Sequence, residues 1–191
     1  MANYSDEQLF RAINTRYSDA GNVIMYYTTW MGEGYIIVGV LLSLFFIKRF
    51  RNWWYFLLAL LCNLLPFFIQ QSIKSYYDAP RTMQVLKGRE WIHYQPEWPL
   101  LLYRGYPSGH TEGAFCFFCF LSMLLPDKHR IWGLFFFILA LATGYSRVYL
   151  TAHFFSDIYL GSIVGAVTPI LIYSIMTIIK ERFTNKTAVS A

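Results

Sequence analysis

Apolar and charged positions alternate along the chain in long blocks, and this pattern indicates helices that cross a membrane. Residues 53–73 form an uncharged run of 21 residues, and residues 158–179 form another of 22. The hydrocarbon core of a bilayer is about 30 Å thick, and a helix needs about 20 apolar residues to cross it. Both runs are therefore predicted to be transmembrane helices.

Three further runs complete the pattern. Residues 21–47 contain one charge, Glu33, in 27 residues, and residues 131–146 are uncharged, so a helix continuing to about residue 150 would cross. The run 106–126 carries His110 and Glu112 near its start. It crosses the membrane only if both residues lie near a polar boundary. The sequence thus predicts an all-α integral membrane bundle of about five transmembrane helices, forming a single domain over residues 1–191.

Residues 1–20 are too polar for another span. Ser5 and Gln8 have the spacing of a helix capping box. One helical face would carry Leu9, Ala12, Ile13 and Tyr17, opposite Asp6, Glu7, Arg11 and Arg16. We expect a short interfacial helix, which could be counted as a sixth helix; a solvated tail is the alternative. No basic-then-apolar leader pattern precedes it.

Basic residues concentrate in three segments that five spans place on one side of the membrane. These are Lys48, Arg49 and Arg51; Lys128 and Arg130; and Lys180, Arg182 and Lys186. The positive-inside rule makes that side, including the tail 180–191, cytoplasmic. The segment 74–107 then faces outward in the plasma membrane. It carries aromatic residues suited to lipid headgroups, namely Trp91, Tyr94, Trp98, Tyr103 and Tyr106.

Composition supports a membrane protein. Apolar residues make up 56% and charged residues 14%, against about 25% charged in an average globular domain. This excludes a disordered chain and a disulfide-stapled secreted module. The net charge of +5 is explained by the positive-inside pattern and does not indicate nucleic acid. Cys116 and Cys119 are expected to be buried on a helix.

The charged residues within or beside the predicted spans gather at one surface. Lys74 follows the second span, His110 opens the third, Arg147 closes the fourth, and His153 and Asp157 open the fifth. All of these ends face outward. A channel or transporter would distribute polar groups through the depth of the bilayer. With Arg81, the cluster predicts an anion site, and phosphate is the obvious anion at a membrane surface.

Local sequence supports phosphate chemistry at this surface. Ser108 and Gly109 should lie at a helix N-terminus, where free N–H groups and the helix dipole bind phosphate. His153 and Asp157, four residues apart, should share a helix face, so that the carboxylate fixes the tautomer of a nucleophilic imidazole. His110 could protonate the leaving oxygen. The cations Lys74, Arg81 and Arg147 would neutralise the phosphoryl oxygens.

These residues also carry a resemblance. The sequence has Lys74, six residues and Arg81; then Pro107-Ser108-Gly109-His110; then Ser146-Arg147, five residues, His153, three residues and Asp157. This resembles the three-part signature of the type-2 phosphatidic acid phosphatase family. One departure is that Pro80 precedes Arg81, whereas the family usually has Pro after the Arg.

The resemblance implies a membrane phosphatase that works without a metal or cofactor, through a phosphohistidine. His153 would be the nucleophile, Asp157 its orienting partner and His110 the acid. The phosphoryl group would be held by Lys74, Arg81, Ser108, Gly109, Ser146 and Arg147; the role of Ser146 comes from the resemblance alone. Substrates would be lipid phosphates of the undecaprenyl diphosphate, phosphatidylglycerophosphate, phosphatidic acid or lipid A type.

Several alternatives stay open. The ligand types of His110, Glu112, His153 and Asp157 would suit zinc, although three cations nearby oppose it. The phosphoryl group could pass to another lipid instead of water, and a transporter or lipid binder could share the fold. A small outward segment favours a prenyl or glycerol-lipid phosphate over lipid A. Glu33 and Glu112 receive no role, and His93 and His129 are expected in solvated loops.

Overall fold

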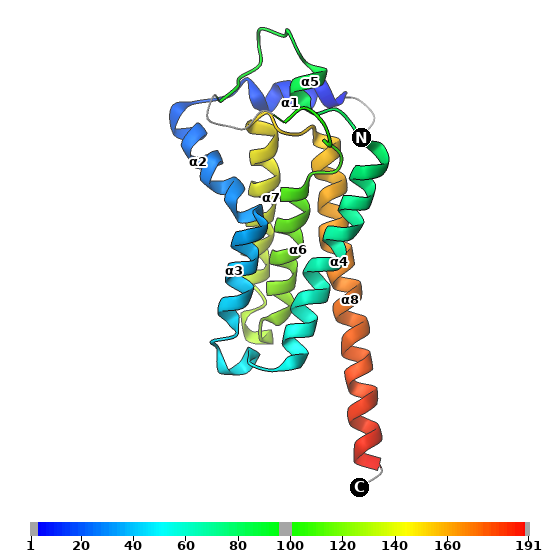
Figure 1. The fold of residues 1–191 in the computed structure, drawn as a ribbon. Helices are drawn as coiled ribbons and strands as arrows, with labels where there is room; N and C mark the ends of the chain where they lie inside the picture. Colours follow the sequence, from blue (N-terminus) through cyan, green and yellow to red (C-terminus); the bar gives the residue numbers. More distant parts are fainter. Residues whose placement is uncertain (1–3, 96–100, 190–191) are drawn as a thin grey trace.

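The computed structural model describes residues 4–95 and 101–189, and side chains up to residue 182. Its helices are α1 (Asp6–Asn14), α2 (Asp19–Thr29), η1 (Trp30–Gly32), α3 (Gly34–Leu44), η2 (Lys48–Phe50), α4 (Trp53–Tyr77), α5 (Thr82–Val85), α6 (Gly109–Leu124), η3 (Asp127–His129), α7 (Trp132–Tyr149) and α8 (Phe155–Val189). The described residues contain no strand, and the predicted all-α bundle is confirmed (Figure 1).

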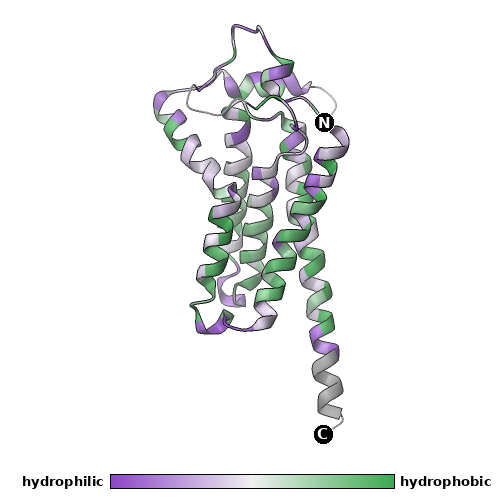
Figure 2. Ribbon diagram, viewed as in Figure 1, coloured by the Kyte–Doolittle hydropathy of each residue, from purple (hydrophilic) through white to green (hydrophobic). Residues whose placement is uncertain are grey.

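Among the described residues, three helices are long and apolar enough to cross a membrane: α4, α7 and α8. The shorter α3 and α6 run beside them in the same bundle (Figure 1). Hydrophobic residues fill the middle of the bundle and hydrophilic residues gather at its ends, as Figure 2 shows. Many apolar side chains of α4, α7 and α8 point outward and are exposed, as expected of a surface that faces lipid.

The prediction of one helix over residues 21–47 is wrong. The chain forms α2, bends through η1, and starts again as α3 after Glu33. Gly32 lies directly against the backbone carbonyl of His110, too close for any side chain at that position. The bend therefore lets η1 pack on the first turn of α6 and brings Glu33 to that turn.

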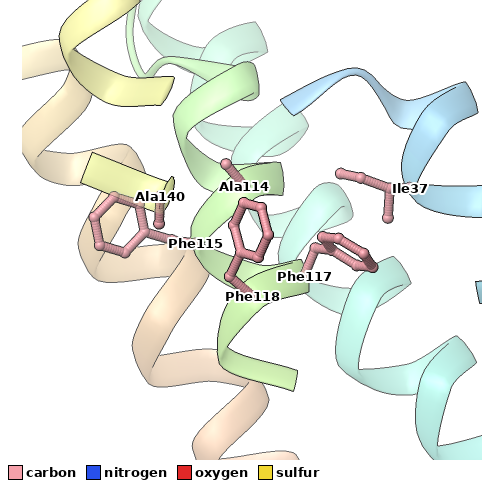
Figure 3. Close-up of a cluster of buried hydrophobic side chains, with 6 residues drawn as sticks. All are labelled: Ile37, Ala114, Phe115, Phe117, Phe118 and Ala140. Carbon is pink, nitrogen blue, oxygen red and sulfur yellow. The ribbon is translucent and has the colours of Figure 1, made fainter. Parts of the chain in front are cut away.

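The central helix is α6. Its buried side chains include Ala114, Phe115, Phe117 and Phe118, which pack with Ile37 and Ala140 in one core cluster (Figure 3). Against its other side lies α8, and a Cβ on Gly161 would come within 2.7 Å of the Ser108 carbonyl oxygen. Such a small residue lets two membrane helices approach closely.

The two ends of the bundle differ. At one end α1, α5 and the loops around them lie across the start of α6 and the end of α7 (Figure 1). At the opposite end are the turns with η2 and η3, and α8 projects beyond them (Figure 1). This agrees with the predicted placement of the basic turns on one side. Helix α8 does not end at residue 179 but continues to Val189, and Trp98 lies outside the described residues.

The N-terminal helix α1 has the predicted capping box: the Ser5 hydroxyl accepts from the Gln8 N–H, and the Gln8 side chain accepts from the Ser5 N–H. Its buried side chains are Phe10 and Asn14, neither of which belonged to the predicted apolar face. Phe10 packs with Leu86 and neighbouring apolar residues. Thus α1 packs across the end of the bundle through Phe10 and Asn14.

Candidate active site

The turn between α7 and α8 positions His153. Thr151 has a left-handed backbone, with φ of 60°, and the His153 N–H donates to the Arg147 carbonyl oxygen at 3.2 Å. Because α8 begins only at Phe155, the prediction that His153 and Asp157 share a helix face is wrong. Asp157 lies in the first turn of α8 and reaches back to His153 from there.

Both ring nitrogens of His153 have partners. Asp157 Oδ2 lies 3.2 Å from Nδ1 and also accepts from the Phe154 N–H at 2.9 Å. Arg81 Nη1 lies 3.4 Å from Nε2. Arginine only donates hydrogen bonds, so Nε2 must accept and the proton must lie on Nδ1, toward Asp157. The two neighbours thus select one tautomer, whose Nε2 lone pair faces the guanidinium.

His153 is almost completely buried, with 1% of its surface exposed. Burial lowers the pKa of this imidazole well below 6.5, and the positive charges of Arg147, Arg81 and Lys74 lower it further. The ring is therefore unprotonated at neutral pH. An unprotonated ring nitrogen in a cationic pocket is the form that can attack phosphorus.

Three cations from separate segments surround this pocket. Arg81, just before α5, is buried and donates from Nε to the Tyr103 carbonyl oxygen at 3.0 Å. Arg147, in the last turn of α7, is buried and donates from Nη1 to Thr29 Oγ1 at 2.7 Å. The partners in these two hydrogen bonds are a backbone carbonyl and a hydroxyl, which carry no formal charge. Such a pocket favours an anion.

The N-terminus of α6 provides the remaining wall. Ser108 is its N-cap, and the hydroxyl accepts from Thr111 Oγ1 at 3.0 Å. The Ser108 N–H donates to the Asp157 carbonyl oxygen at 3.0 Å, which joins this turn to α8. Lys74 Nζ lies beside Gly109, 3.6 Å from where a Cβ would be. A lysine at the free N–H groups of a helix start is a phosphate-binding arrangement.

His110 forms an unpredicted pair with Glu33. Glu33 Oε1 lies 2.7 Å from His110 Nε2, joining the bend before α3 to the first turn of α6. Sequence reasoning left Glu33 unassigned because the apolar run gave no sign that the chain bends there. The carboxylate supplies negative charge that favours a protonated His110.

Asn14 is a second residue that sequence reasoning missed. Its buried amide donates to the carbonyl oxygens of His93 and Tyr149, both at 3.1 Å, and to Thr151 Oγ1 at 2.9 Å. It also accepts from the His93 N–H at 2.9 Å. Thus α1 fixes the turn that carries His153. A polar residue on a short amphipathic helix carries no local signal for such a role.

Ser146 and His93 are two of the remaining positions that the sequence analysis named. Ser146 is buried, and its hydroxyl donates to the Thr143 carbonyl oxygen at 2.6 Å, within α7. His93 lies in a loop as expected, but it is partly buried and its ring stacks on Tyr17 with centroids 3.6 Å apart. Within residues 4–95 and 101–189, no three His, Cys, Asp or Glu side chains gather as a metal-ligand group.

Buried cations lie together with His110, in the first turn of α6, and His153, just before α8, at one end of a helical bundle. The model of the PAP2 superfamily matches residues 52–180. The chain belongs to this superfamily, as its motifs predicted, and it is a membrane protein with the fold of a lipid phosphatase family. No curated protein sequence matched the chain.

Two solved structures are similar. The crystal structure of LpxE from Aquifex aeolicus matches with a TM-score of 0.75 and 24% sequence identity, covering 91% of this chain and 98% of that one. A transmembrane PAP2-type phosphatidylglycerolphosphate phosphatase from Bacillus subtilis matches with a TM-score of 0.73 and 23% identity, covering 89% and 83%. At these identities the matches show a shared fold.

Proposed function

We propose that this protein hydrolyses lipid phosphate monoesters or diphosphates at the outer face of the plasma membrane, through a phosphohistidine on His153. The observation that carries the proposal is the pair of contacts at the two ring nitrogens of His153. Asp157 at Nδ1 and Arg81 at Nε2 together leave a lone pair on Nε2, inside a pocket of positive charge. A protein that only bound phosphate would need the cations but not an oriented nucleophile.

The chemistry follows in two steps. The Nε2 lone pair of His153 attacks phosphorus, the bond to the ester oxygen breaks, and His110 gives a proton to that oxygen. Arg81 moves from Nε2 to a phosphoryl oxygen, where Lys74 and Arg147 add charge. Water then attacks phosphorus, His110 takes its proton, and the phosphorus–nitrogen bond breaks to release phosphate.

The substrate class follows from the position of the pocket. It lies at the end of the bundle, where the phosphate of a membrane lipid would sit at headgroup depth. The predicted outward segment is short, and Asn14 hydrogen-bonds to its His93, which supports a site with little protein to recognise a large sugar headgroup. A prenyl or glycerol-lipid phosphate therefore fits better than a lipid A phosphate.

The test is phosphate release by the purified protein in detergent, with undecaprenyl diphosphate, phosphatidylglycerophosphate, phosphatidic acid and lipid A compared at equal surface concentration. Release from the first three exceeding release from lipid A is expected. A clear preference for lipid A would contradict the substrate assignment, and no release from any of them would contradict a phosphatase.

The outer location needs a separate test. In intact cells an impermeant thiol reagent should label Lys87→Cys, in the outward segment, much faster than Arg49→Cys, in the turn before α4. The native cysteines are little exposed and give a low background. Equal labelling of the two positions would contradict the orientation.

A further inference from the structure

An apolar cavity of about 660 Å³ opens between α3 and α4 and is closed on its inner side by α6. Lys74, Gly109 and His110 lie at one end of it, and Phe50 and Tyr55 line the other. The cavity therefore begins at the phosphate pocket. From Lys74 to Tyr55, α4 extends about 28 Å at 1.5 Å per residue, close to the thickness of a bilayer core.

Glu112 lies where this cavity leaves the phosphate pocket. It is on α6, in the turn after Gly109, and it lines the cavity together with Lys74. Only 3% of its surface is exposed, and Oε1 has no hydrogen-bond partner among the described residues. A buried polar atom without a partner costs about 1–3 kcal/mol. An acceptor left open at this place indicates that a ligand supplies the donor.

We propose that Glu112 accepts a hydrogen bond from a hydroxyl group beside the phosphate ester of a lipid whose single hydrocarbon chain fills the cavity. This inference rests on the proposed phosphatase function. The phosphate lies between Lys74 and the start of α6, so the carbons after the ester oxygen pass Glu112 next. Behind Glu112 the walls are apolar, formed by residues such as Ala59, Leu60 and Phe120.

The chemistry of Glu112 narrows the substrate. The open Oε1 of Glu112 accepts a hydrogen bond from a hydroxyl but not from the ester carbonyl that replaces this hydroxyl in a diacylated glycerol. This acceptor favours a monoacylglycerol phosphate with its middle hydroxyl free over diacylated glycerol phosphates.

The recognition test compares 1-oleoylglycerol 3-phosphate with the same lipid lacking the middle hydroxyl. In the intact protein the hydroxyl should raise kcat/KM by up to about 10-fold, the size of one well-formed hydrogen bond. Glu112→Met should remove this ratio, and Glu112→Gln, which keeps an acceptor oxygen, should retain part of it. Glu181→Met, at an exposed position on α8, is the matched control and should keep the full ratio.

The chain is tested separately with Ala59→Phe, which places a ring in the cavity. The intact protein should have a lower KM for the oleoyl than for the octanoyl lipid, and the variant should lose that difference. Two results would overturn the role of Glu112: equal rates with and without the hydroxyl, or an unchanged ratio in Glu112→Met. An unchanged chain-length preference in Ala59→Phe would overturn the role of the cavity. In each case phosphatase activity would still stand. Absence of release from every lipid phosphate would overturn the proposed function itself.

Discussion

The carboxylate of Glu33 lies 2.7 Å from Nε2 of His110, although 77 residues separate them in the chain. One residue belongs to the bend before α3 and the other to the first turn of α6. Around His110 the charged neighbours are otherwise cations, which oppose a protonated imidazole. Glu33 therefore supplies the negative charge that a general acid at this position needs.

Replacing Glu33 by Gln should slow turnover of alkyl phosphates about 10-fold or more, because general acid catalysis contributes roughly 10²–10⁴-fold. The loss should be much smaller with p-nitrophenyl phosphate, whose leaving oxygen needs no proton. Steady-state rates on the two substrates give this comparison, with Glu181→Gln as control. An equal loss on both would show that Glu33 acts on folding or binding instead.

Asp157→Asn should impair chemistry more than binding. The amide can donate to His153 Nδ1, which would place the proton on Nε2 and remove the lone pair. By analogy with the aspartate-to-asparagine change in serine proteases, kcat should fall by about 10⁴-fold. Vanadate, a phosphoryl mimic, should still inhibit at a similar concentration. A weak effect on kcat would contradict the assigned tautomer.

Asn14→Leu should destabilise the protein although Asn14 lies outside the motifs. The change keeps the size of the side chain but leaves the His93 N–H without its acceptor and removes three donated hydrogen bonds in a buried place. The expected loss is about 1–3 kcal/mol in the free energy of unfolding, measured by thermal unfolding in detergent. Unchanged stability would mean that α1 does not hold the turn at His153.

The lowered pKa of His153 predicts a pH dependence of stability. Below about pH 6.5 the unfolded chain binds a proton at this histidine that the folded protein does not bind, so stability falls as the pH decreases. His153→Gln should lessen that fall between pH 7 and 5.5, and His129→Gln, at an exposed position, should not. Identical thermal unfolding profiles for the His153 variant and the parent protein would contradict the buried, unprotonated ring.

Much of the site was predictable because its signals are local. The residues at the start of α6 and in the turn before α8 lie at breaks between apolar runs, and the Ser5–Gln8 capping box involves neighbours in sequence. The bend at Glu33 was not predictable, since it depends on Gly32 packing against the His110 backbone. An apolar run with a single charge, such as residues 21–47, has the same sequence pattern whether it forms one helix or two.

The structure shows the predicted contact between His153 and Asp157, but the contact does not arise from the predicted shared helix face. Spacing by four suggested a common helix face, but α8 starts after His153, and the contact forms because Asp157 caps that start and accepts from the Phe154 N–H. The contacts of Asn14 with the turn before α8 likewise arise from tertiary packing of α1. Such contacts join segments more than 70 residues apart, and one sequence contains no signal for them.

The central claim is a phosphoryl group carried on His153, and trapping it is the most direct test. His110→Ala should accumulate the intermediate with p-nitrophenyl [³²P]phosphate, because the leaving group needs no acid whereas the attacking water still needs a base. Rapid quenching in alkali should give labelled protein with an acid-labile, base-stable bond, and the label should lie on the peptide containing His153. Absence of label, label at another residue, or equal labelling of a variant that also carries His153→Gln would contradict the account.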